Sequence, residues 1–133
     1  MLEEDRMGEW KVQVARILGE PTTSILENYY GSESADLLEV NDERLLTFYD
    51  YLRDELKFPF MARYKQAKNA YELVCTRLDQ ETNVNEADGI KLACKHGETK
   101  WIIPLSEMVV DEKDVNFSTI MLYQKWFLGS KGI

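Results

Sequence analysis

The 133-residue chain has few of the residues on which redox and nucleophilic sites are built. It contains one histidine, His96, and two cysteines, Cys75 and Cys94. A single histidine excludes a His-rich metal site, and two cysteines are too few for a disulfide framework. Cys94 and His96 share a face of one predicted strand, but nothing supplies an orienting group or an oxyanion motif. We therefore expect no catalytic site, and two reduced, half-buried thiols on neighbouring strands that could face each other.

Long apolar runs and phosphate-binding motifs are also absent. No apolar segment reaches the length that spans a membrane, and the N-terminus "MLEEDRMGEW" is too acidic for a signal or transit peptide. There is no Gly-rich phosphate loop and no G-x-S-x-G motif. On these grounds we expect a soluble, cytoplasmic protein, and the apolar share of 44% is enough for it to fold.

Basic residues are outnumbered in the first half of the chain. The net charge is −8. Residues 1–61 carry 14 acidic and six basic side chains, whereas residues 62–133 carry ten of each. Nucleic-acid binding needs a positive surface, so this balance argues against it. It favours cations, or a basic protein, as the partner.

The helical part is predicted over residues 1–57. Apolar residues at helical spacing around Trp10 and Val14 predict a helix that Gly19 ends. A capping-box pattern, Ser24 with Glu27, predicts a short second helix. Asn41 is a suitable N-cap for a third helix that begins "DERLLTFYDYL".

The β part is predicted over residues 58–110. Four β-rich segments, "FPFMARYKQ", "AYELVCTRL", "GIKLACKHG" and "KHGETKWIIPL", are separated by turns. Residues 111–133 then give a linker and a final helix. The pattern predicts a single α+β domain, in which N-terminal helices pack on a small antiparallel, SH3-like β-barrel or half-barrel, with a C-terminal helix.

The segment "LDQETNVNEADG", residues 78–89, contains many oxygen-bearing side chains and no base. Asp79, Glu81, Asn83 and Asp88 are the candidate ligands. Calcium binds six to eight such oxygens, and a divalent ion relieves the repulsion between crowded carboxylates. The loop is no EF-hand, because the position of the closing glutamate is Ile90.

Two further acidic segments are candidates for the same chemistry. One is "GSESADLLEVND" with Asp36, and the other is "DEKDVN" with Asp111 and Asp114. For all three segments the alternative is a solvated loop that joins secondary-structure elements.

Three quoted pieces are similar to a known family. "YLRDELKFPFMARY", then "DGIKLACKHGETKWIIPLSEM", then "NFSTIMLYQKWF" resemble the cyanobacterial calcium-binding protein family, CcbP, over residues 42–128. The resemblance implies a cytoplasmic calcium-binding protein without EF-hands, which buffers or senses free Ca2+ during cell differentiation in filamentous cyanobacteria. It also implies that binding depends on surface acidity and not on one contiguous loop. Asp36 is a candidate because it lies in the acidic half.

These observations together predict a Ca2+-binding protein without enzymatic activity. The proposed metal ligands are Asp36, Asp79, Glu81, Asn83, Asp88, Asp111 and Asp114. We expect no nucleic-acid or membrane partner. The alternatives are an acidic interaction module that binds a basic protein and an enzyme that uses Cys94 or carboxylates with magnesium.

Overall fold

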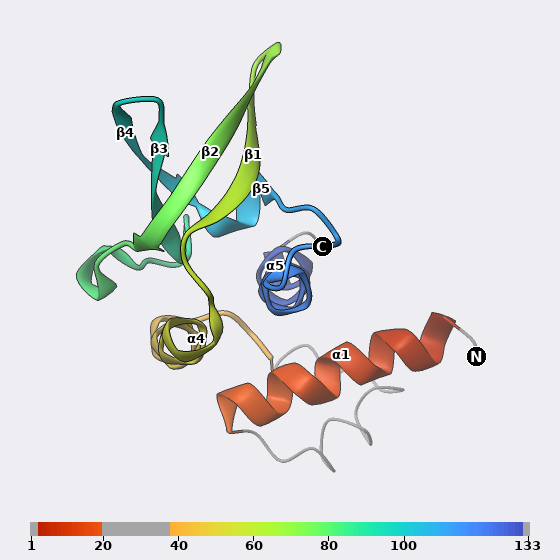
Figure 1. Cartoon of the computed structure of the whole chain (residues 1–133). Coiled ribbons are helices and arrows are strands. Elements are labelled where there is room, and N and C mark those ends of the chain that lie inside the picture. Colours follow the sequence, from red (N-terminus) through yellow and green to blue (C-terminus); the bar gives the residue numbers. More distant parts are fainter. Residues whose placement is uncertain (1–2, 20–37, 132–133) are drawn as a thin grey trace.

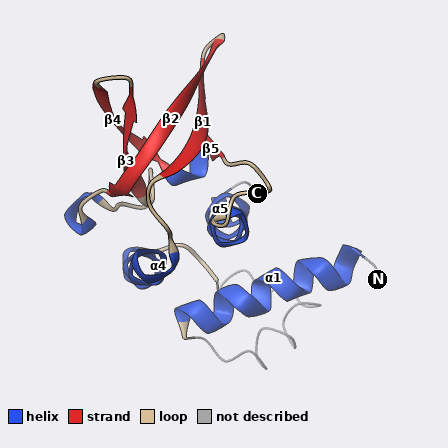
Figure 2. Cartoon of the chain, viewed as in Figure 1, coloured by secondary structure: helices blue, strands red, loops and turns tan. Residues whose placement is uncertain are grey.

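The computed structural model describes residues 3–19 and 38–131, and it forms three stacked layers (Figure 1). Helix α1 (Glu3–Leu18) forms the outer layer. Helices α4 (Asp42–Glu55) and α5 (Phe117–Lys131) lie between α1 and a curled β-sheet, and α1 contacts both of them. Figure 2 shows the same separation of helices from strands. The predicted α+β fold with a C-terminal helix is confirmed.

Local signals in the sequence determine where the described helices begin and end. The Asn41 side chain accepts a hydrogen bond from the backbone N–H of Arg44 at 2.8 Å, as an N-cap does. Helix α1 ends before Gly19, whose φ of +78° is left-handed and favours glycine. The short helix predicted after Ser24 lies outside the described residues.

The sheet contains five antiparallel strands in the order β4-β3-β2-β1-β5. Its members are β1 (Phe60–Gln66), β2 (Asn69–Leu78), β3 (Lys91–His96), β4 (Thr99–Pro104) and β5 (Met108–Val109). Strand β5 follows a 3₁₀ turn, η2 (Leu105–Glu107), and pairs with β1 through Arg63 and Val109. This long-range pairing places a strand from the end of the β part at the sheet edge beside β1.

An aromatic cluster joins the two inner helices. The ring of Phe48 on α4 stacks on Trp126 of α5 with centroids 4.9 Å apart, and it meets Tyr123 edge-on at 5.4 Å. Trp126 also donates its indole N–H to the carbonyl of Leu38 at 2.6 Å. All three rings are fully buried, so they fix α5 against α4 beneath the sheet.

Asn116 fastens the start of α5 to the connection between α4 and β1. It is 1% exposed; its Oδ1 accepts from the Lys57 N–H at 2.8 Å, and its Nδ2 donates to the Lys57 carbonyl at 2.9 Å. We expect Asn116→Ala to lower the free energy of unfolding by about 2–3 kcal/mol, because it removes both partners of Lys57. Urea unfolding measures this loss.

Val115 provides the control for this prediction. It is 76% exposed, so Val115→Ala should change the free energy of unfolding by less than about 0.5 kcal/mol. Equal losses for the two variants would contradict a bracing role for the Asn116 amide.

Candidate functional site

The oxygen-rich loop connects β2 to β3 and is anchored to the helical layer at both ends. The hydroxyl of Tyr49, on α4, donates to the Asp79 carbonyl at 2.7 Å. The hydroxyl of Tyr123, on α5, accepts from the Ile90 N–H at 2.9 Å. The Asp79 N–H also donates to the Lys91 carbonyl at 2.9 Å. The ends of the loop are therefore fixed by the fold, while its middle faces solvent.

Short-range hydrogen bonds shape the middle of the loop. It contains a 3₁₀ turn, η1 (Glu81–Asn83), and then a tight turn closed by the Gly89 N–H donating to the Asn85 carbonyl at 2.7 Å. The Asn85 Oδ1 accepts from the Asp88 N–H, also at 2.7 Å. Such side-chain to backbone bonds are the reason that Asn and Asp are frequent in turns. The Asn and Asp side chains of the loop therefore stabilise its turns, in addition to any role as metal ligands.

The donor atoms of the loop are of the kind that calcium prefers. Asp79 is 6% exposed, and its Oδ2 accepts from the Asn83 Nδ2 at 3.0 Å. Glu81 and Asp88 are exposed carboxylates. Carboxylate, amide and backbone carbonyl oxygens are the ligands of hard divalent cations. The chemistry of the loop therefore fits Ca2+ and does not fit a soft metal.

Lys91 supplies a positive charge to this loop from the first residue of β3. Its ammonium nitrogen is 3.2 Å from the Asn83 carbonyl oxygen and 3.6 Å from a carboxylate oxygen of Asp88. Its side chain is only 19% exposed. An ammonium between a carbonyl and a carboxylate compensates part of the negative charge that a metal ion would otherwise neutralise.

The phenol of Tyr49 lies in the negative field of the same loop. Burial raises its pKa, and the carboxylates of Glu81 and Asp79 raise it as well, while Arg53 and Arg77 oppose them. The phenol therefore stays protonated at neutral pH and donates to the Asp79 carbonyl. Burial also raises the pKa of Tyr123. Neither anchor loses its proton near physiological pH.

Asp111 and Asp114 belong to the linker between β5 and α5, and Figure 1 shows this linker well away from the loop between β2 and β3. The Asp111 Oδ1 accepts from the Lys113 N–H, and the Asp114 Oδ1 accepts from the Asn116 N–H, both at 2.8 Å. These carboxylates shape the turn that leads into α5. Asp36 lies outside the described residues. Asp79, Glu81, Asn83 and Asp88 thus share one loop, in which Asn83 bonds to Asp79, and Asp111 and Asp114 belong to a different segment.

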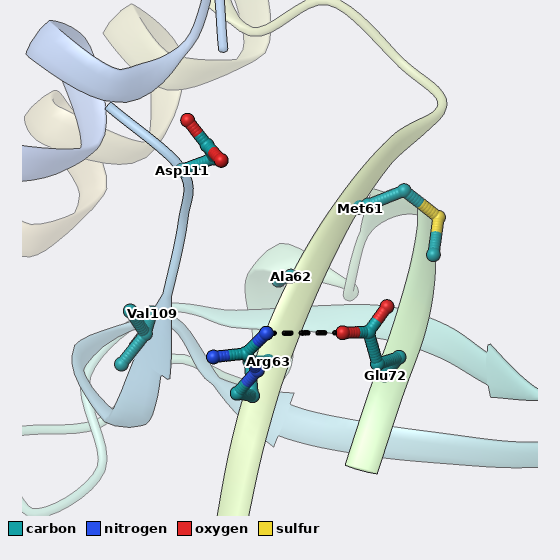
Figure 3. A pocket seen from close by; sticks show the side chains of 6 residues that line it. All are labelled: Met61, Ala62, Arg63, Glu72, Val109 and Asp111. Carbon is teal, nitrogen blue, oxygen red and sulfur yellow. Dashed lines mark hydrogen bonds and ion pairs between the residues drawn. The ribbon is translucent and has the colours of Figure 1, made fainter. Parts of the chain in front are cut away.

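Asp111 also borders a cavity of about 220 Å³ at the edge of β1 (Figure 3). Inside this cavity the guanidinium of Arg63 pairs with Glu72 at 3.1 Å, while Asp111 lies across from them on the linker. The positive charge of Arg63 partly neutralises these carboxylates and so weakens their attraction for a cation.

No ready-made carboxylate cage is present in the part of the chain that the structure describes. There, no group of three or more histidine, cysteine, aspartate or glutamate side chains comes together as metal ligands. Carbonyl and amide oxygens must complete any calcium site at the loop, together with water.

Three functional neighbours of the loop, Lys91, Tyr49 and Tyr123, are missed by reasoning from the sequence. Lys91 lies only two positions beyond the acidic segment, and this nearness in the sequence was a usable sign that it contacts the loop. The tyrosines are 30 and 33 residues from the backbone groups that they bind, and no local pattern marks them. They become visible only when the helices are packed on the sheet.

Comparison with known proteins identifies the family. The family model Calci_bind_CcbP, described as calcium binding, matches residues 35–127. The chain belongs to this calcium-binding family. The resemblance inferred from the three sequence segments is thereby confirmed, and Ca2+ is the ion that the family binds.

Two solved structures share the fold. One is a calcium-binding protein in its calcium-binding form, 18% identical, with a TM-score of 0.55 over 77% of this chain and 89% of the other. The other is CcbP from Anabaena, 15% identical, with a TM-score of 0.53 over 85% of this chain and 94% of the other. At these identities the likeness establishes the fold and not the ligands.

One curated enzyme also shows a partial likeness. It is an N-acetyl-gamma-glutamyl-phosphate reductase from Acetivibrio thermocellus, 28% identical over 75 residues. The match covers 53% of this chain and 22% of the length of the reductase.

Among residues 3–19 and 38–131, no helix is long and apolar enough to cross a membrane.

Proposed function

We propose that this CcbP-family protein binds Ca2+ at the loop between β2 and β3 and serves as a buffer or sensor of cytoplasmic calcium. The carboxylates of Asp79, Glu81 and Asp88 and the oxygens of Asn83 are the proposed ligands. Asp36, Asp111 and Asp114 are proposed as ligands of other ions. A single non-enzymatic domain with a role in cyanobacterial cell differentiation is part of the same proposal, and membership of a calcium-binding family supports its calcium-binding part.

One observation supports the choice of this loop. The helical layer anchors its two ends, but the negative charge of its carboxylates is only partly neutralised. Tyr49 and Tyr123 hold both ends of the loop. The ammonium of Lys91, which belongs to β3, lies between the Asn83 carbonyl and the Asp88 carboxylate of the loop. A divalent ion would compensate the acidic loop more completely than a single ammonium.

This arrangement implies moderate affinity. The ion has to compete with Lys91 and to order the exposed carboxylates of Glu81 and Asp88. Exposed charges are screened by salt, so binding should weaken as ionic strength rises. Moderate, salt-sensitive affinity suits a protein that exchanges calcium with its surroundings.

Calorimetric titration of the full chain in chelator-treated buffer tests this proposal. We expect heat of binding below millimolar calcium, and a loss of affinity of at least about tenfold in the double variant Asp79→Asn/Asp88→Asn, since each change removes a negative charge. The matched control is Glu98→Gln/Glu107→Gln, which removes the same charge from two exposed side chains that are not proposed ligands.

The results distinguish three situations. A loss confined to the first variant supports the loop. Equal losses in both variants would move the site away from the loop. An absence of heat at near-millimolar calcium with the unmodified chain would overturn calcium binding itself.

A further inference from the structure

Cys75 and Cys94 face each other across two neighbouring strands of the sheet. They are directly paired residues of β2 and β3, and their sulfur atoms are 3.6 Å apart. Directly opposed residues of antiparallel strands have Cα atoms about 4.5–5.5 Å apart. Disulfides accept Cα separations of about 4.4–6.8 Å, so the separation typical of such an opposed pair lies within the range of a disulfide.

The surroundings of the pair keep both sulfur atoms in register. Cys75 is fully buried and Cys94 is 2% exposed. The thioether sulfur of Met108, on β5, lies 3.9 Å from the Cys75 sulfur. Immediately after Cys75 the pairing of β2 with β3 shifts, and the Thr76 hydroxyl donates to the Ala93 carbonyl at 3.1 Å. The two thiols are therefore confined to one side of the sheet with no competing cysteine.

The two thiols are not equivalent. The hydrogen bond between them lowers the pKa of Cys94 and raises the pKa of Cys75, and burial raises that of Cys75 further. Cys94 is 2% exposed, whereas Cys75 is fully buried. Because the thiolate is the reactive form, we expect a small oxidant to react with Cys94 first.

We propose that Cys75 and Cys94 are a modification site that closes to a reversible cross-strand disulfide, with a small peroxide as the oxidant. The Cys94 thiolate attacks the O–O bond of hydrogen peroxide and becomes a sulfenic acid, while the other oxygen leaves as hydroxide and takes up a proton to become water. The Cys75 sulfur then attacks the Cys94 sulfur and loses its proton, and a second water leaves. Two thiols lose two electrons, and the peroxide gains them.

The disulfide would enclose the whole connection between β2 and β3. Residues 75–94 would become a closed ring that contains the loop from Asp79 to Ile90. A cross-link of this kind restricts the unfolded chain and leaves the paired strands in place. We therefore expect the oxidised protein to melt at a higher temperature than the reduced protein.

Hydrogen peroxide treatment of the full, reduced chain tests the site. We expect an intact mass lower by two hydrogen atoms, no dimer on non-reducing gels, and a cross-linked peptide pair containing Cys75 and Cys94 after proteolysis. Dithiothreitol should reverse all three changes. Circular dichroism before and after treatment verifies that the folded protein has reacted.

Two variants separate the roles of the thiols. In Cys75→Ser the sulfenic acid of Cys94 has no partner, so dimedone should label it more strongly than it labels Cys75 in Cys94→Ser. If either variant fails to fold, peptide mapping of the peroxide-treated, unsubstituted chain still shows whether Cys75 and Cys94 are cross-linked. Two free thiols after a peroxide dose that oxidises a folded dithiol reference protein, or a disulfide between two chains, would overturn the proposal.

Discussion

Gly89→Ala should lower the free energy of unfolding by about 3 kcal/mol, the largest stability effect that we expect from a single methyl group in this protein. Gly89 has a φ of +70°, which costs an alanine about 1–2 kcal/mol. A Cβ there would also collide with the Tyr123 hydroxyl and lie 2.8 Å from the Phe127 ring. Crowding of that kind costs a further 1–3 kcal/mol or so. Urea unfolding of both proteins measures the sum.

Gly97 offers a matched control for this prediction. It has a φ of +61°, but an added Cβ would meet nothing within 4 Å. Gly97→Ala should therefore show only the backbone cost, about 1–2 kcal/mol. If the two alanine variants lose the same stability, the close approach of Gly89 to α5 does not matter, and the loop is less tightly seated than its contacts indicate.

Lys91→Met should raise the affinity of the chain for calcium by about tenfold. The ammonium of Lys91 lies 3.2 Å from the Asn83 carbonyl and 3.6 Å from the Asp88 carboxylate, which are proposed ligands. Repulsion between an ammonium and a divalent ion a few ångströms apart in solvent is about 1–2 kcal/mol, which corresponds to roughly a factor of ten. Methionine keeps most of the aliphatic length of lysine and removes the charge. Calorimetric titration at low and at moderate salt measures the change.

Lys95 is the control for Lys91. It lies on the same strand, β3, but it is exposed and pairs across to Val74, away from the loop. Lys95→Met removes the same charge and should leave calcium affinity nearly unchanged. An affinity that falls, or stays the same, in Lys91→Met would show that the ion does not compete with this ammonium, and the site would have to be sought elsewhere.

The two predictions concern different properties of one loop. Gly89 and the two tyrosines determine where the ends of the loop lie relative to the core. Lys91 determines how much negative charge remains for an ion in its middle. A loop with anchored ends loses less conformational freedom when it binds an ion than a free loop would. Calcium affinity should therefore respond to changes in the packing of α4 and α5 as well as to changes in the ligands.

The sequence by itself determined the parts of this protein that depend on neighbouring residues. Asn41 caps α4 and Gly19 follows α1, because caps act within one turn of the helix. The β-rich segments between turns predicted the four longer strands, and the acid-rich composition of residues 78–89 indicated calcium. The three quoted segments led to the family that the comparison confirmed.

Only the tertiary structure decided what those local pieces do together. It separated Asp111 and Asp114 from the loop and used their oxygens in turns. It also brought Tyr49 to Asp79 across 30 residues of sequence and Tyr123 to Ile90 across 33 residues. The physical reason is that a tyrosine has the same local pattern whether its hydroxyl faces water or a backbone group far away in the sequence. Its partner is chosen by long-range packing, which no short window of sequence contains.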